Sequence, residues 1–325
     1  MKRFEKIIIG FLGVCCISLI VVATNQSQST VYKSPKAKFV KASIKFDMNP
    51  DNLFAHKKNK NDGVLEYLTV NALAKKFTLL NYDFGNIINE GASVPRILIV
   101  NMPRDIRKIR TPKNRKLVFF KTILPLVLEV NKNILRDRSR VLRISARKTK
   151  TEKISVVDRL WLSALCERYE VERNNFSKIL RRVDIIPPSI ALAQAAEESG
   201  WGTSRFVLEG NALFGQYTFD TNYALVPRSR DKGKEHTIRA FKTLLDAVSS
   251  YARNLNTHRA YRGFREKRQL LRLNGDKIAG DKLAMKLIGY SERGRKYVRT
   301  IQSIMRANRL ENLDNSKIQK DFLQN

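Results

Sequence analysis

The chain has 325 residues, of which 43% are hydrophobic, so it can form one large domain or two modest ones, and disorder throughout is excluded. Its 62 lysines and arginines outnumber 30 aspartates and glutamates and give a formal net charge of +32. Such a charge attracts polyanions: nucleic acid, an anionic membrane face or an acidic cell-wall polymer. Charge alone does not choose among them, because a solvated basic surface gives the same balance.

The N-terminus has the pattern of an export signal. Three basic residues within the first six positions precede an apolar run, Ile7 to Ala23, that is broken only by Ser18. A basic segment followed by an apolar core directs export and is then either cleaved or kept as an anchor. The sequence therefore predicts a signal peptide or membrane anchor over residues 1–23. The body of the protein is then expected in the periplasm, tethered to the inner membrane where the segment is retained.

Cysteines and histidines indicate neither a disulfide nor a metal site. Cys15 and Cys16 fall in the export segment, which leaves Cys166 without an internal partner. The surrounding segment "WLSALCERYE" is typical of an amphipathic helix, so a small buried hydrophobe is favoured over a catalytic cysteine. No metal or cofactor is expected, because the three histidines are too scattered for a metal-site spacing: His56, His236 and His258.

The region before the centre of the chain is basic. Residues 24–62 are polar and lysine-rich without a sustained period, which is typical of a linker. Ile97–Val100 is predicted as a short strand, and "KLVFFKTILPLVLEVNKNIL" as a helix or helix pair, bent or started near Pro125. Between Arg104 and Lys150, 16 lysines and arginines face 3 acidic residues. This helical N-terminal region, residues 63–154, is either a docking face for an anionic partner or a helical hairpin with solvated lysines.

The second half alternates helices with one β-rich segment. Its predicted helices are Ser155–Tyr169, Phe176–Val183, a helix containing "SIALAQAAEES" that Gly200 ends, Thr243–Asn256, Arg262–Leu273, Gly280–Ile288 and Arg295–Asn308. The segment Phe214–Phe241 is rich in aromatic, β-branched and turn residues and is predicted to form a small β-lobe, with "DKGKE" as a hairpin tip. Residues 311–325 are predicted to be a polar tail that frays. The fold class is mainly α.

Two adjacent glutamates, Glu197 and Glu198, lie in the last turn of the "SIALAQAAEES" helix, just before Gly-Trp-Gly. The negative end of the helix dipole disfavours an ionised glutamate there. A neighbouring tryptophan that excludes water acts in the same direction. Both effects favour a carboxylic acid that keeps its proton near neutral pH, as a general acid needs.

The helix geometry favours the second glutamate. Glu198 shares a face with Ala191, Gln194 and Ala195, which leave room for a substrate groove, whereas Glu197 lies about 100° away. Glu198 is therefore the better catalytic candidate, and Gln194 is expected to line the groove. The alternative is that both are solvated helix-end glutamates.

Several separated motifs carry a family resemblance. "LAQAAEESGWGTS" followed by "GNALFGQY" resembles the bacterial glucosaminidase domain of peptidoglycan hydrolases, the family of flagellar and autolytic glucosaminidases. "GKEHTIRAF", "YARNLNTHRAYRGFR" and "YSERGRKYV" look like the Bax-type glucosaminidases of Gram-negative bacteria within that family, and "LPLVLEVNKNILRDR" resembles the region that precedes the domain there. The resemblance covers roughly Pro95 to Leu310, with the motifs in the expected order.

The resemblance implies a lysozyme-like α+β fold with a small β-lobe and a glucosaminidase domain over residues 155–310. It also implies cleavage of the β-1,4 bond between N-acetylglucosamine and N-acetylmuramic acid in peptidoglycan strands. The family's catalytic glutamate, in "ESGWG", falls on Glu198. At Glu197 the chain departs from the family's usual leucine.

The other site residues are weaker candidates. The β-lobe of family members often supplies a second carboxylate, and of Asp231 and Glu235 in the matching stretch Glu235 is our choice. Tyr290 matches a tyrosine that lines the cleft in relatives, where its hydroxyl can hold the substrate's acetamido group, and Asn211 is expected to tie the loop after the helix to the site. Three aromatic residues are candidates for stacking on sugar rings, or else belong to the core: Trp201, Phe214 and Tyr217.

Two other functions remain open. A lytic transglycosylase also uses a glutamate in an "ES" context, but that family usually continues with "GLMQ", where this chain has "ALFGQY". A noncatalytic, membrane-tethered protein that binds glycan or nucleic acid explains the charge but not "ESGWG". Because an exported protein does not meet nucleic acid, the expected partners are peptidoglycan strands together with an anionic wall or membrane surface.

Overall fold

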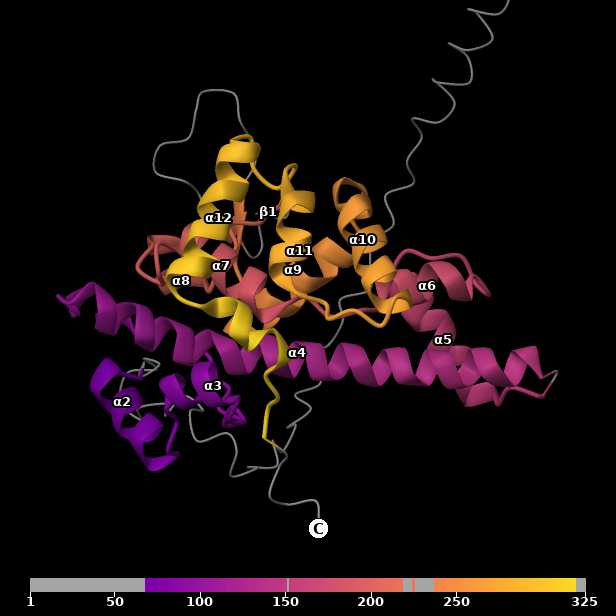
Figure 1. Ribbon diagram of the computed structural model, residues 1–325, viewed down its shortest axis with the longest axis horizontal. Helices are drawn as coiled ribbons and strands as arrows, with labels where there is room; N and C mark the ends of the chain where they lie inside the picture. The colour runs from indigo at the N-terminus through magenta and orange to yellow at the C-terminus, as the bar shows by residue number, and fades with distance from the viewer. Residues whose placement is uncertain (1–67, 151, 219–223, 226–236, 320–325) are drawn as a thin grey trace, which may run out of the picture. The chain divides into compact units, whose positions relative to one another are not determined.

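The computed structural model describes residues 68–150, 152–218, 224–225 and 237–319 (Figure 1). The chain divides into two compact units, and every described residue belongs to the second, Asn49–Asn325. The predicted export segment and hairpin tip lie outside the described residues. Within the described ranges, no helix combines the length and the apolar character that crossing a membrane requires.

Helices dominate the fold, which confirms the predicted fold class. The first part contains α2 (Val70–Leu79), α3 (Phe84–Glu90), the 3₁₀ helix η2 (Arg104–Lys108) and α4 (Pro112–Thr149). The middle contains α5 (Val156–Arg168), α6 (Phe176–Arg182), α7 (Pro188–Ser199) and α8 (Arg205–Gly210). The last part contains α9 (Leu244–Thr257), η4 (Arg259–Tyr261), α10 (Arg262–Leu273), α11 (Gly280–Ala284), η5 (Met285–Leu287), α12 (Arg295–Ala307) and η6 (Leu310–Asn315).

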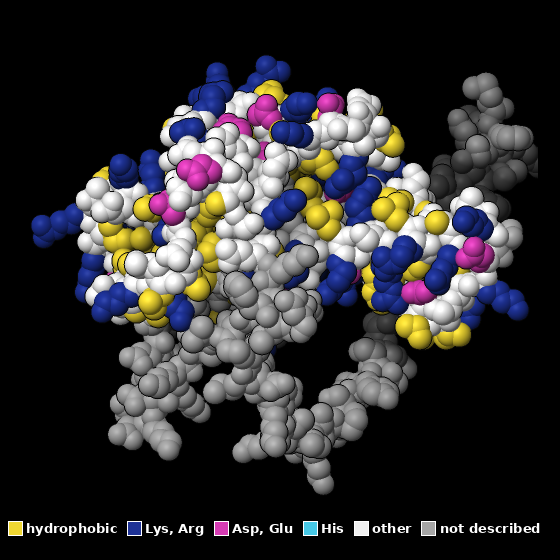
Figure 2. Space-filling view, turned by 60° about the horizontal axis from the view of Figure 1, so that its bottom comes forward, with side chains coloured by type: hydrophobic (Ala, Val, Ile, Leu, Met, Phe, Trp, Pro, Cys, Tyr) yellow, Lys and Arg dark blue, Asp and Glu magenta, His cyan; other side chains and the backbone are white. Residues whose placement is uncertain are grey.

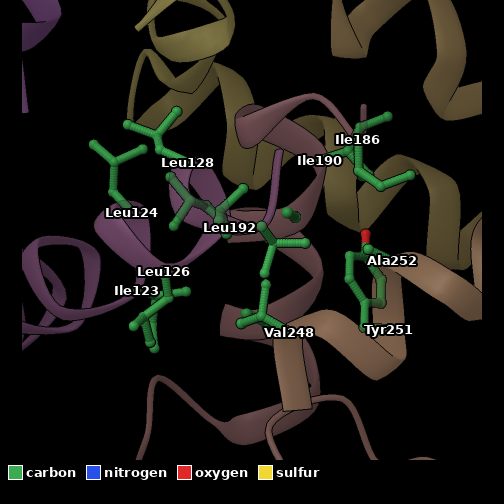
Figure 3. Packing of buried hydrophobic residues seen from close by; sticks show 14 of the residues in the cluster. Ile123, Leu124, Leu126, Leu128, Ile186, Ile190, Leu192, Val248, Tyr251 and Ala252 are labelled. Carbon is green, nitrogen blue, oxygen red and sulfur yellow. The ribbon is translucent and has the colours of Figure 1, made fainter. Parts of the chain in front are cut away.

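Helix α4 is the central element of the core. It is one helix of 38 residues that continues through Pro125, so of the two arrangements predicted here the single helix is correct. Its middle is buried on all sides, as expected for a helix that is apolar around its whole circumference. Figure 3 shows side chains of α4, such as Leu126, beside Leu192 of α7 and Val248 of α9. Buried residues from both sides of the boundary predicted near residue 154 thus belong to one cluster.

The predicted β-lobe is a small antiparallel sheet of three strands. They are β1 (Tyr217–Thr218), β2 (Ala224–Leu225) and β3 (Thr237–Arg239), in the order β1-β3-β2. Ile238 is paired with Tyr217 on one side and with Leu225 on the other. The loop Asn211–Gln216 leads from α8 into β1, and its Phe214 stacks on Tyr251 of α9.

Two local predictions are wrong. Ile97–Val100 is not a strand but an irregular segment, and Ile97 and Ile99 are buried in the core. The chain does not fray directly after Leu310, because η6 packs on α7 and the Asp314 carboxylate accepts hydrogen bonds from Ser189 and Gly280. The polar sequence pattern did not predict this contact, since Asp314 is partly buried and its partners come from distant parts of the chain.

Candidate active site

Glu198 lies one residue before the end of α7, as the sequence predicts. Gly200 ends the helix in the left-handed conformation with φ 56°, and Trp201 and Gly202 follow with φ 61° and 78°. A Cβ atom at Gly202 would lie 3.1 Å from side-chain atoms of Met102 and Phe119. Glycine is therefore required there both by the conformation and by the close approach to the core. This tight turn fixes the end of the helix and, with it, the place of the Glu198 carboxyl.

A chain of hydrogen bonds orients the Glu198 carboxyl. The Tyr251 hydroxyl donates to Gln194 Oε1 at 2.7 Å, and Gln194 Nε2 donates to the Tyr297 hydroxyl at 2.8 Å. Tyr297 in turn donates to Glu198 Oε1 at 2.8 Å. Because the Tyr297 hydroxyl already accepts from Gln194, its proton is committed to Glu198. Oε1 is thus occupied as an acceptor, which leaves Oε2 as the oxygen that can carry the proton of the acid form.

Glu198 Oε2 points to the side on which the loop into β1 passes. A Cβ atom at Gly215 would lie 3.8 Å from this oxygen, and Gly215 itself adopts φ 59°. Because Gly215 has no side chain, a larger side chain is kept away from Oε2 at this position. The proton-bearing oxygen therefore faces the junction of α7 with the β-lobe.

Aromatic rings surround the buried side of this carboxyl. Tyr290 stacks on Tyr297 with ring centroids 5.4 Å apart, and Tyr261 lies 5.9 Å from Tyr290. We call these three residues the tyrosine row. On the other side of the hydrogen-bond chain, Phe214 stacks on Tyr251 at 3.8 Å. The row and this pair place apolar ring surface around a single carboxyl group.

Burial raises the pKa of Glu198 above its usual range. The hydrogen bond from Tyr297 opposes this shift, the charge of Glu197 adds to it, and the charge of Arg293 opposes it. The net direction is the one that the sequence predicts, but the aromatic surroundings differ from the expected ones. The carboxyl charge is felt by the tyrosines, whereas the Trp201 ring packs edge-on against Phe119 and Phe120 of α4.

Glu197 has a separate partner. Its Oε1 lies 2.6 Å from Nη1 of Arg293, which follows directly after "YSE" in the loop before α12. The Glu197 side chain is about one quarter exposed and the Arg293 side chain about one half. The charge that replaces the family's usual leucine is thus neutralised at the surface, and the two neighbouring carboxyls have different environments.

The other predicted site residues are in varied positions. Asn211 is buried, and its Nδ2 donates to Asn101 and to the carbonyls of Phe241 and Lys242, so it ties the loop after α8 to the start of α9. Tyr217 is 67% exposed on β1. Tyr290 is partly exposed in the tyrosine row. Glu235 and its alternative Asp231 lie outside the described residues.

Three residues predicted to contact the substrate pack against other parts of the protein in the structure. Gln194 is completely buried and its amide is used by two tyrosines, so it positions the acid and does not reach a groove. Phe214 is buried against Tyr251. Trp201 contacts α4, and Lys116 lies 4.6 Å above its ring. Gln194 and Phe214 are therefore part of the core, whereas Trp201 is partly buried against α4.

Sequence reasoning missed Tyr297, Tyr251 and Arg293. Tyr297 and Arg293 both belong to the motif "YSERGRKYV", in which only the first tyrosine was singled out. Tyr297 lies on the buried face of α12 together with Val298 and Ile301, and a tyrosine on such a face needs a hydrogen-bond partner. That requirement was the available signal, but it does not say which partner the hydroxyl meets.

Fold and site together define a class of protein. A carboxyl with a raised pKa, with one oxygen hydrogen-bonded and the other near Gly215 without a hydrogen-bond partner among the described residues, is suited to donate a proton to a leaving oxygen. A mainly helical protein that carries such a group at a helix end fits a glycoside hydrolase.

Comparisons with known proteins place the chain more closely. The family model described as "Glucosaminidase: Mannosyl-glycoprotein endo-beta-N-acetylglucosaminidase" matches residues 173–310, which run from just before α6 to the start of η6. Protein bax of Escherichia coli (strain K12) is 33% identical over 199 residues, which are 59% of this chain and 69% of that protein. A search of solved structures found no significant match. The chain therefore belongs to the glucosaminidase family, a family of endo-β-N-acetylglucosaminidases, and the predicted resemblance is confirmed.

Proposed function

We propose that this glycoside hydrolase cleaves the β-1,4 bond between N-acetylglucosamine and N-acetylmuramic acid in peptidoglycan, with Glu198 as the general acid. The observation that carries the proposal is the environment of Glu198: a raised pKa, with Oε1 held by Tyr297 and Oε2 without a hydrogen-bond partner among the described residues. Such a carboxyl donates a proton to the glycosidic oxygen as the bond to the leaving sugar breaks.

The identity of the bond is tested by the products. Purified glycan strands are digested, reduced with borohydride and analysed by mass spectrometry. The proposal expects N-acetylglucosamine at every new reducing end. New reducing ends of N-acetylmuramic acid would assign the enzyme to the other bond of the strand, and anhydro ends would favour the transglycosylase alternative.

Glu235 is proposed as the second catalytic carboxylate. An acid at Glu198 leaves the opposite side of the sugar without support for the oxocarbenium-like transition state or for the attacking water. Glu235→Gln is expected to lower kcat by about 100-fold or more with little change in glycan affinity. Asp231→Asn is the matched control and is expected to be nearly silent. The reverse result would move the role to Asp231, and two silent variants would favour participation by the substrate's acetamido group.

Two substitutions beside Glu198 are expected to move its pKa in opposite directions. Tyr297→Phe removes the hydrogen bond that lowers this pKa, so the pKa rises. Glu197→Gln removes a negative charge that raises it and frees Arg293, so the pKa falls. Since a general acid acts in its protonated form, the alkaline limb of the pH profile of kcat/KM should move up for Tyr297→Phe and down for Glu197→Gln. If the alkaline limbs of the two variants shifted in the same direction, the assignment of Glu198 as the general acid would be contradicted.

Localisation outside the cytoplasm is part of the proposal. The pattern of residues 1–23 and a peptidoglycan substrate both require the body to reach the periplasm. An alkaline phosphatase reporter fused after Asn325 is expected to be active in intact cells, because this enzyme needs an oxidising compartment to fold. A fusion protein that is produced but shows no phosphatase activity would remove both the localisation and the proposed substrate.

An anionic wall or membrane surface is proposed as the partner of the basic exterior. Figure 2 shows lysine and arginine side chains spread over the visible face, where they far outnumber the acidic ones. Long-range attraction of this kind concentrates an enzyme on a polyanionic surface and weakens with salt.

A further inference from the structure

A cavity of about 290 Å³ lies where α6, η4 and α10 meet. Its lining consists entirely of basic residues, Lys178, Arg181, Arg182, Arg259, Arg262 and Arg265. We call it the cationic pocket. Six cations around one small cavity repel one another, and a fold keeps such an arrangement at a cost in stability unless something offsets the repulsion.

Neighbouring carboxylates offset only part of this charge. Glu266 lies 2.7 Å from Arg262 and 3.8 Å from Arg181, whereas Glu170 lies 3.5 Å from Arg182. Glu172 is at the outer limit of an ion pair with Lys178, at 4.0 Å. None of these three acids lines the cavity. The carboxylates pair with the basic side chains from outside the cavity, and only the basic side chains line it.

Two of the arginines have no carboxylate within ion-pair distance among the residues that the structure describes. Arg259 is exposed in η4, and Arg265 is buried. Nη1 of Arg265 donates to the carbonyls of Leu255 and His258, which fixes its guanidinium in place. Burial lowers the pKa of Arg265 to about 10, and the charges of Arg182 and Arg181 contribute to this shift. The pocket thus contains two arginines that no ion pair among the described residues neutralises, and the guanidinium of one of them, Arg265, is fixed in place.

The pocket adjoins the proposed active site. Arg259 and Arg262 flank Tyr261, whose own ring belongs to the tyrosine row that leads through Tyr290 and Tyr297 to Glu198. The Glu198 charge is felt by the Tyr261 hydroxyl. The segment from Arg259 to Arg262 therefore contributes the Tyr261 ring to the tyrosine row and two arginines to the cationic pocket.

We propose that the cationic pocket binds an oxyanion ligand with several negative charges, supplied by two or more carboxylates or by phosphate groups. Guanidinium groups form two parallel hydrogen bonds with such groups, and the cavity has room for a small polyanion but not for a sugar strand. Its position beside the tyrosine row makes an acidic substituent of the bound glycan, such as the carboxylates of an attached peptide, the expected ligand. This assignment of the source rests on the proposed function; the oxyanion site itself does not.

The site is tested with the full chain and inorganic pyrophosphate, by isothermal titration calorimetry. The test variant is Lys178→Gln/Arg262→Gln, because both side chains are partly exposed and their removal leaves the core intact. Its Kd is expected to rise by about tenfold or more, since two charge-assisted contacts are lost. The matched control is Arg136→Gln/Arg143→Gln, a pair of exposed arginines on α4, and it should bind as the parent does. Equal weakening in both variants, or no binding by the parent at millimolar pyrophosphate, would overturn the proposal.

The source of the oxyanion is tested with two substrates. Glycan strands that carry their acidic peptides are compared with strands from which the peptides have been removed. The Lys178→Gln/Arg262→Gln variant is expected to lose kcat/KM on the peptide-bearing strands only. Equal activity of variant and parent on both strands, with pyrophosphate binding still lost, would overturn the glycan source and assign the pocket to a phosphate ligand. If the parent protein bound pyrophosphate but cleaved neither kind of strand, the oxyanion site would stand and the proposed function would fail.

Discussion

Replacing Glu198 by glutamine is expected to lower the rate of glycan cleavage by about three orders of magnitude while leaving the fold unchanged. The amide keeps the size of the side chain and can still accept the hydrogen bond from Tyr297 at its oxygen. It has no acid proton, however, so the leaving oxygen must depart without one. Circular dichroism and thermal unfolding would check the fold, and a zymogram with peptidoglycan would measure the loss.

Glu197→Gln is the matched control for this prediction. The two residues are adjacent and chemically identical, but Glu197 is paired with Arg293 at the surface. Its substitution should keep most of the activity and change chiefly the pH profile. Lysis that survives in Glu198→Gln and disappears in Glu197→Gln would show that the catalytic carboxyl is the neighbour.

The second large effect concerns stability. Asp184, between α6 and α7, is buried and receives two hydrogen bonds from Arg272, at 2.5 and 2.6 Å. Arg138 and the fully buried Arg268 lie 3.6 and 4.0 Å from the same carboxylate. Asp184→Asn removes the negative charge among three guanidinium groups, so we expect the free energy of unfolding to fall by about 3 kcal/mol or more. Urea denaturation measures this change.

The pH dependence of the same group has a defined sign. Burial alone would raise the pKa of Asp184, but the hydrogen bonds from Arg272 and the charges of Arg268 and Arg138 outweigh it, so the pKa is lowered. The unfolded state then binds a proton first as the pH falls. The stabilisation is therefore present at neutral pH and is lost as the pH drops below the unfolded pKa through the folded one. Glu266→Gln, at an exposed pair, is the control and should change stability little. Similar losses in both variants would contradict a special role for the buried cluster.

Much of the helical framework followed from local sequence patterns. Ser155 and Asn175 cap α5 and α6 with their side chains, and Gly200 ends α7 in the left-handed conformation. The helices predicted to begin at Ser155 and Phe176, and the helix end predicted at Gly200, were found because helix starts and glycine ends depend on a few adjacent residues. The short β-lobe was also visible, since its aromatic and turn-forming residues interrupt a long helical pattern.

Long-range contacts were beyond the reach of sequence patterns. Gln194 was expected in a groove because it shares a helical face with Glu198, but that face is covered by Tyr251 and Tyr297 from two other helices. The spacing along α7 correctly placed Gln194 and Glu198 on one face of the helix, but it does not say which other elements pack on that face. For the same reason the partner of Glu197 appeared only once Arg293, 96 positions away, was placed beside it.

The direction of the Glu198 pKa was predicted for a reason that needs revision. The sequence suggested that the next tryptophan excludes water, whereas the Trp201 ring packs on Phe119 and Phe120. The tyrosine row surrounds the carboxyl instead. Trp201 lies only three residues after Glu198, but beyond the helix end and in the left-handed conformation, so its ring packs on α4 instead, which the linear sequence does not reveal.

The most direct test of this account is digestion of peptidoglycan strands in water enriched in oxygen-18. If Glu198 protonates the leaving oxygen and water completes the displacement, each new reducing-end N-acetylglucosamine should carry one heavy oxygen in the mass spectrum. Products without the heavy oxygen, in the anhydro form, would contradict hydrolysis and identify the enzyme as a transglycosylase.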